Sequence, residues 1–236
     1  MILDLHIHTS RYSADSSLCP QVLIREAKRR GLHGVVVTEH DCCWDRFQAQ
    51  ALAQEHGFLF LRGMEVSTDL GHILVYGLET YVPGIMRAET LRRVVEAAGG
   101  AMVAAHPFRR AFTRQFRNGR EPMPRSLEEA ARHPLFALVD GIEVCNGGSA
   151  DSENRLAMEV CHYLGLTPVG GSDAHSEHGI GYYATRFEEG IASEADVVAA
   201  LKQGRTQAVM YHAHENGGGY IESQGAARFR QARGWC

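Results

Sequence analysis

The sequence lacks several features that would place it in a common class of protein. No apolar run approaches the roughly 20 residues that a membrane helix needs, and an apolar strand opens the chain, so we expect no signal peptide. The formal net charge is −4 and there is no basic block, so bulk charge does not favour nucleic acid binding. The six cysteines show no CxxC spacing and no disulfide framework, which favours reduced thiols in a cytoplasmic protein.

Length and composition favour one globular domain with an unusual histidine content. Of the 236 residues, 44% are hydrophobic and 22% are charged, which is typical of a soluble protein. A chain of this length is long for a single domain unless it forms a barrel. No stretch has the composition of a linker, so we expect a barrel domain over 1–214 and a polar, glycine-rich tail over 215–236, loosely ordered. The anomaly is the thirteen histidines.

The first eight residues form an apolar run that predicts a buried strand and contains two of these histidines. His6 and His8 are two residues apart, so both imidazoles leave the same face of an extended chain. Two neutral imidazoles that converge in this way suit a divalent transition metal. For this motif taken alone, an accidental pair of core or surface histidines is the alternative.

The same arrangement recurs along the chain. Apolar, β-branched runs alternate with amphipathic helical segments, which predicts an α/β fold with a parallel sheet. Candidate ligands stand at the ends of at least five successive strands: His6 with His8, Glu39 to Asp41, Glu65, His106, and Asp173 with His175. In an α/β barrel these ends open on one face, where active sites lie. A doubly wound sheet usually shows a glycine-rich phosphate loop, and neither GxGxxG nor GxxxxGK occurs here. The pattern therefore favours a closed or distorted barrel.

Five short motifs, in this order, resemble the signatures of the PHP (polymerase and histidinol phosphatase) superfamily. They are DLHIHT from Asp4, TEHD from Thr38, GMEVS from Gly63, AHP from Ala105 and GSDAH from Gly171. The resemblance implies a single-domain, TIM-like, distorted (βα)7 barrel. It also implies a cluster of two or three divalent ions (Mn, Zn or Fe) and the hydrolysis of phosphate esters.

The resemblance further implies a set of metal ligands. His6, His8, Glu65 and Asp173 would hold one ion; Glu65, His72 and His106 a second; and Asp15, His40 and His175 a third. Glu65 would be the bridging carboxylate. Mixed imidazoles and carboxylates suit borderline-hard divalent ions, and bridged ions can share a hydroxide nucleophile. Because Asp15 lies in a serine-rich turn, capping of that turn is its alternative role.

Substrate contacts are expected just beyond the ligands. Arg109 and Arg110 follow His106 closely, and their guanidinium groups can clamp a phosphate. The alternative is a solvated arginine-rich loop, which continues with Arg114, Arg117 and Arg120. Asn146, at a strand end, would bind substrate or brace a ligand.

The predicted function is a metal-dependent phosphoesterase that hydrolyses a phosphate mono- or diester through a metal-bridging hydroxide. Glu65, Asp41 and His175 are the expected catalytic residues, with Asp41 orienting a bound water or a ligand histidine. A small phosphate ester is the expected substrate, and exonuclease action on short oligonucleotide ends is an alternative. Two further alternatives are a PHP module without turnover, which would not need nine ligands, and an amidohydrolase, whose carboxylated lysine has no counterpart at a strand end here.

Overall fold

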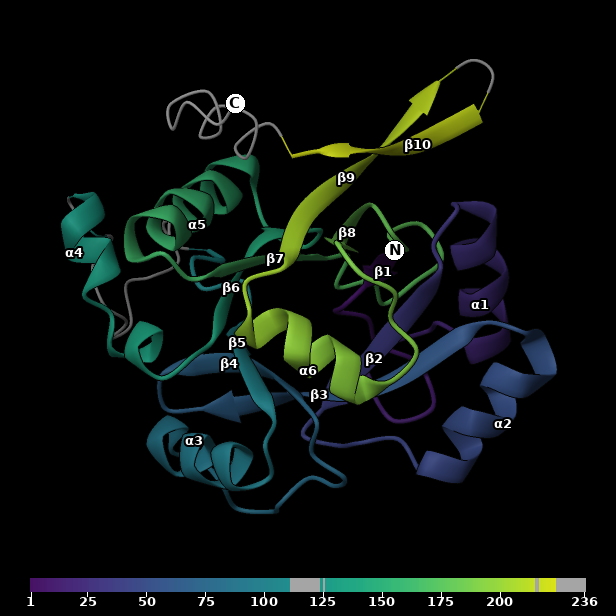
Figure 1. Cartoon of the computed structure of the whole chain (residues 1–236), viewed down its shortest axis with the longest axis horizontal. Helices are drawn as coiled ribbons and strands as arrows, with labels where there is room; N and C mark the ends of the chain where they lie inside the picture. The colour runs from purple at the N-terminus through teal and green to yellow at the C-terminus, as the bar shows by residue number, and fades with distance from the viewer. Residues whose placement is uncertain (111–123, 125, 215–216, 224–236) are drawn as a thin grey trace.

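One mixed sheet of ten strands organises the protein. The computed structural model describes residues 1–110, 124, 126–214 and 217–223. The strands lie in the order β10-β9-β8-β1-β2-β3-β4-β5-β6-β7, and helices lie around the outside of the curled sheet (Figure 1). The predicted single-domain α/β fold of barrel type is confirmed.

The first three strands are parallel, as the alternation of strands and helices predicts. They are β1 (Ile2–Asp4), β2 (Gly34–His40) and β3 (Leu59–Thr68), connected by α1 (Pro20–Arg29) and α2 (Arg46–His56). Strand β2 is buried on both faces: Val35 and Val37 belong to the core that includes α1, and Val36 belongs to the core on the opposite face. This double burial explains the continuous β-branched run.

Strand β4 corrects the expectation of a fully parallel sheet. β4 (Gly71–Tyr76) follows β3 after only two residues and pairs antiparallel with β3 and with β5 (Ala101–Ala104), which comes after α3 (Ala88–Ala97). A parallel pair needs a crossover of about a dozen residues, so this short turn allows only a hairpin. Its register sets His72 opposite Ser67, on the face of the sheet that carries Glu65.

The sheet then returns to parallel pairing and closes on its first strand. A short helix α4 (Leu127–Ala131) and a 3-10 helix (Pro134–Ala137) lead to β6 (Gly141–Asn146), α5 (Asp151–Leu164) and β7 (Thr167–Gly171). Beyond the ends of β1 and β7, Ile7 and Ala174 form a parallel bridge, and the Asp173 amide donates to the His6 carbonyl at 2.7 Å. The closure brings the two chain segments that carry candidate ligands side by side.

The last strands extend the sheet from the other side of β1. β8 (Tyr183–Phe187), β9 (Thr206–His214) and β10 (Gly217–Glu222) are antiparallel to their neighbours, with α6 (Glu194–Lys202) between β8 and β9 in sequence. The expectation of a loosely ordered chain from residue 215 is wrong for Gly217–Glu222, because β9 supplies a hydrogen-bonding edge for them. The boundary at residue 214 stays a prediction, and residues 224–236 lie outside the described ranges. None of the helices in those ranges has the length and apolar character needed to cross a membrane.

Candidate metal centre

Among the described residues, imidazoles and carboxylates from six chain segments meet at one face of the barrel. Three groups have ligand atoms within 4.8 Å of one another: His6, His8, Glu65 and Asp173; Glu65, His72 and His106; and His8, His40 and His175. Each lies at or just beyond a strand end or, for Glu65 and His72, in the β3–β4 hairpin. The structure therefore brings the sequence-predicted residues together.

The first group is the most buried, with His6 and His8 fully inaccessible to solvent. The Nε2 atoms of His6 and His8 are 3.1 Å apart, and each lies 3.2–3.4 Å from Glu65 Oε2 and from Asp173 Oδ1. A point equidistant from atoms spaced in this way lies about 2 Å from each, the length of a bond from Zn²⁺ to imidazole nitrogen or carboxylate oxygen. The donor set and its spacing fit a divalent ion.

Glu65 joins this first group to the second. Its Oε1 atom lies 2.7 Å from His72 Nδ1 and 2.9 Å from His106 Nε2, while Oε2 faces the first group. Oε2 is buried and lies 3.1–3.3 Å from nitrogens of His6, His8 and His40, but it makes no hydrogen bond of acceptable geometry among the described residues. A cation between these nitrogens and Oε2 would satisfy the oxygen, and Glu65 would then bridge the two groups.

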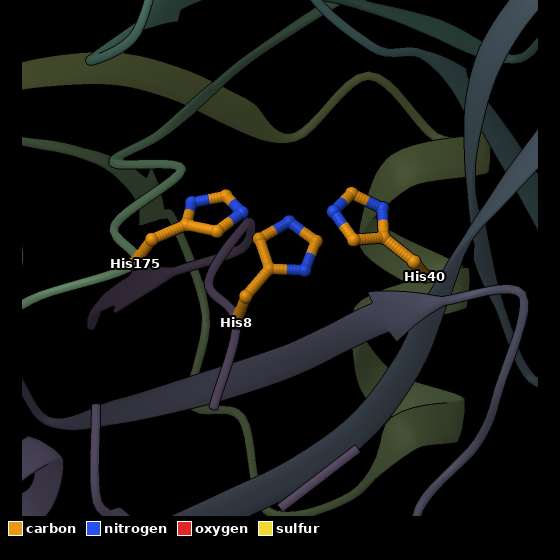
Figure 2. A group of neighbouring side chains, drawn as sticks. All are labelled: His8, His40 and His175. Atoms are coloured by element: carbon orange, nitrogen blue, oxygen red, sulfur yellow. The ribbon is translucent and has the colours of Figure 1, made fainter. Parts of the chain in front are cut away.

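The third group includes His8, which the sequence did not predict there, and the predicted Asp15 lies beside the group. Figure 2 shows the rings of His40 and His175 turned toward His8 from opposite sides, with ring centroids 4.2 Å and 4.4 Å from that of His8. Asp15, whose side chain is 58% exposed, places Oδ2 at 3.2 Å from His40 Nε2 and 3.3 Å from His175 Nε2. His8 therefore stands between the first and third groups, although we assigned it to the first alone.

The charges of the buried residues are strongly coupled. Burial by itself would lower the pKa of His6, but Asp173, Glu143 and Glu65 together raise this pKa well above its ordinary value. Burial would raise the pKa of Glu65 and that of Asp173, yet the neighbouring imidazoles hold both pKa values well below the ordinary range. The carboxylates are therefore ionised, as metal ligands must be.

Positive φ angles occur at four of the candidate residues, one of them Arg110, whose φ is 64°. Asp41, His106 and Asp173 have φ angles of 48°, 28° and 52°, a region that non-glycine residues rarely adopt. At Asp41 the strain has a local use: its amide donates to the Glu65 carbonyl, and its Oδ1 accepts from the Ser67 amide at 2.9 Å. Asp41 thereby connects the end of β2 to β3 at Glu65 and at Ser67. Its catalytic role and that of His175 stay predictions.

Of the residues expected to contact substrate, Arg109 and Asn146 lie beside the candidate ligands, whereas Arg110 is exposed. Arg109 Nη2 donates to Asp173 Oδ2 and, at 2.7 Å, to Asn146 Oδ1, so this guanidinium lies against a candidate ligand. Asn146 is fully buried and its Nδ2 donates to Asp173 Oδ2, which favours the bracing role over substrate binding. The remaining arginines of the loop lie outside the described residues: Arg114, Arg117 and Arg120.

Two buried glutamates lie behind the ligands: Glu39, which the sequence predicted only as a strand-end candidate ligand, and Glu143, which the sequence analysis missed. Glu39 accepts hydrogen bonds from Thr9, Ser13 and Trp44, and Ser13 in turn contacts His8 Nδ1 at 3.3 Å. Glu143 lies 2.9 Å from His6 Nδ1. The available signal was a lone carboxylate inside an otherwise apolar run, since such a charge is rarely buried without partners.

Fold and site together define an α/β barrel protein whose clustered imidazoles and carboxylates could hold metal ions at one face of the barrel. A model of the PHP domain matches residues 4–145, and a model described as PHP-associated matches residues 151–206. The chain belongs to the PHP family, as its motifs suggested.

Individual relatives extend over different shares of the chain. An uncharacterised protein of Methanocaldococcus jannaschii is 29% identical over 171 residues, which are 67% of this chain and 90% of that protein. The 3′,5′-nucleoside bisphosphate phosphatase of Chromobacterium violaceum is 31% identical over 113 residues, which are 41% of this chain and 39% of that enzyme.

Solved structures share the fold at lower identity. A protein of Bifidobacterium adolescentis assigned as a metal-dependent phosphoesterase has a TM-score of 0.59 and 19% identity, over 84% of this chain and 96% of that one. The lesion-specific endonuclease of Pyrococcus furiosus has a TM-score of 0.56 and 18% identity, over 98% of this chain and 66% of that one. At this level of identity the likeness concerns the architecture alone.

Proposed function

We propose that this chain is a hydrolase of phosphate esters that works with two or three divalent ions, Mn, Zn or Fe. The observation that carries the proposal is the sharing of Glu65 and His8 among three groups of candidate ligands. Shared ligands hold ions close enough to act on one phosphoryl group. Bound together, such ions supply a nucleophile at neutral pH and positive charge for the phosphoryl oxygens.

The residues of this chain would divide the work. Glu65 would hold the first two ions through its two oxygens, and the half-exposed His72 would leave the second group accessible to substrate. Asp15, His40 and His175 form the most solvent-accessible group, with side chains 58%, 32% and 30% exposed. A third ion there would exchange most easily, which is why the proposal allows two ions or three.

Arg109 supports a phosphate as the group that is bound. Its Nη2 is held by Asp173 and Asn146, while its buried Nε has no partner among the described residues. A phosphate oxygen beside the first group would provide the acceptor that this donor lacks. Arg109 would therefore serve both as a substrate contact and as the counter-charge of Asp173.

Small phosphate monoesters and diesters are the substrates we propose. The bisphosphate phosphatase of Chromobacterium violaceum, by its name, acts on a 3′,5′-nucleoside bisphosphate, and it is 31% identical to this chain over 113 residues. The exonuclease alternative remains in the test, because an endonuclease shares the architecture.

The test is a substrate screen of protein loaded separately with Mn²⁺, Zn²⁺ or Fe²⁺. p-Nitrophenyl phosphate, its bis ester, a 3′,5′-nucleoside bisphosphate, short oligonucleotides and an amide panel separate the candidate activities. His178→Asn is the matched control, since His178 is exposed and outside the three groups, and Glu65→Gln is the inactive reference. Turnover of amides alone, or of none of these compounds by protein that holds its metals, contradicts the proposal.

A further inference from the structure

Glu143 is a buried carboxylate that reaches both of the deeper metal groups without belonging to either. It lies in β6 and is 1% exposed. Its Oε1 is 2.9 Å from His6 Nδ1, and its Oε2 accepts from the His106 amide at 2.8 Å and from Asn146 Nδ2 at 3.0 Å. Two different ligand-bearing strand ends are thus fixed by one side chain.

The contact with His6 decides which ring nitrogen of that histidine is free. A carboxylate only accepts hydrogen bonds, so Nδ1 of His6 carries the proton that faces Glu143. In the neutral ring, the lone pair is then on Nε2, the atom that faces His8, Glu65 and Asp173. A negative charge behind the ring also makes Nε2 a stronger donor to a cation.

The contacts of the second oxygen of Glu143, Oε2, fix the positions of His106 and Asn146. The His106 amide is held by Glu143 while the backbone of His106 has a φ of 28°, and its Nε2 meets Glu65 Oε1. Asn146 uses the same Nδ2 to contact Glu143 and Asp173. Releasing Oε2 would therefore free a strained backbone in the second group and loosen a carboxylate of the first.

We propose that Glu143 is the positioning residue that fixes the His6 tautomer and the spacing between the first and second metal groups. The inference rests on the proposed function, because it assumes that these groups bind metal. Glu143 itself is not a ligand: His6 and Asn146 stand between it and the converging donor atoms.

Only a carboxylate satisfies this environment. The three partners of Glu143 all donate, and a glutamine amide offers one acceptor oxygen and one donating NH₂. In Glu143→Gln the NH₂ group must face either the His106 and Asn146 donors or His6 Nδ1. The second arrangement forces the proton of His6 to Nε2 and removes a ligand atom, and the first leaves buried donors unpaired.

The test measures metal binding and the His6 tautomer. Zn²⁺ affinity of Glu143→Gln, measured by competition with a chromophoric chelator, is expected to fall roughly ten- to a hundredfold. Glu153→Gln is the matched control: Glu153 is also buried, caps α5 through the Ala150 amide, and should leave Zn²⁺ affinity unchanged. Circular dichroism monitors folding of both variants.

A second measurement is made on the unmodified chain, and the variant His6→Ala serves only to assign the signal. Long-range ¹⁵N–¹H correlation of the zinc-loaded protein should show one histidine ring with a proton on Nδ1 and the metal on Nε2 that is absent from His6→Ala. Coordination of His6 through Nδ1, or Zn²⁺ affinity of Glu143→Gln within twofold of the wild type, overturns the inference. Failure of the wild-type chain to bind Zn²⁺ instead overturns the proposed function.

Discussion

Replacing Glu65 by glutamine is the most direct test of the bridging role. Glu65 Oε1 lies within 2.9 Å of nitrogens on His72 and His106, and Oε2 lies within 3.3 Å of nitrogens on His6, His8 and His40. Glutamine preserves the shape of the side chain and removes its charge from a position that is 1% exposed. In this variant, the five imidazoles around residue 65 no longer have the negative charge of Glu65 beside them.

The size of the effect follows from burial. Removing one partner of a buried ion pair costs roughly 3–5 kcal/mol. At about 1.4 kcal/mol per factor of ten, metal binding should weaken roughly a hundredfold to a few thousandfold. Phosphoesterase activity should fall below detection, because the neutral amide oxygen bridges two cations poorly.

The assay combines equilibrium dialysis against Mn²⁺ or Zn²⁺, elemental analysis of the retained metal, and turnover of the best phosphate ester from the screen. Glu177→Gln serves as the control, since that side chain is 59% exposed and lies 3.9 Å from its arginine partner. A folded Glu65→Gln protein that retains its ions and turns over at a near-normal rate would refute the bridging assignment.

Three more predictions concern the same centre. Purified protein reconstituted without oxygen should hold at least two divalent ions per chain, and elemental analysis that finds fewer than one contradicts the ligand groups. Arg109→Ala should lower kcat/KM roughly ten- to a hundredfold, as loss of a charge-assisted hydrogen bond of about 1.5–3 kcal/mol predicts. Because Arg109 contacts Asp173, Arg109→Ala should also change the metal affinity, whereas Arg110→Ala should not. Equal metal affinity in the two variants would show that the contact between Arg109 and Asp173 does not support metal binding. In metal-free protein the raised pKa of His6 stabilises the fold below about pH 6.5, and this contribution is lost as the pH rises through the folded-state pKa. The lowered pKa values of Glu65 and Asp173 stabilise the fold above their ordinary pKa values, and this contribution is lost as the pH falls. The melting temperature of the metal-free protein should therefore fall on both sides of neutrality. A melting temperature that rises steadily from pH 4 to 9 contradicts this coupling.

Local sequence determined the elements and the placement of most candidate ligands. The two-residue spacing of His6 and His8 sets both rings on one face of an extended chain, whatever surrounds it. Pro20 favours the start of α1 because its ring fixes φ, and Asp45 caps α2 by accepting a hydrogen bond from the Gln48 amide. Parallel strands joined by helices have their carboxyl ends on one side of the sheet. The residues at the predicted strand ends are therefore expected to lie close together in the site.

The tertiary structure alone decided the pairing of β10, the double position of His8, and which residues contact the ligands from behind. His6 and Glu143 are 137 residues apart in sequence, and Arg109 and Asp173 are 64 apart. No local pattern encodes such pairs, because each depends on how the sheet curls and on which side chain then fills the space behind a ligand. A residue that binds an ion at this face must lie at or near a strand end, and that position can be recognised in the sequence. A carboxylate that orients that ligand needs only to be buried within hydrogen-bonding reach, and burial is a property of the folded barrel.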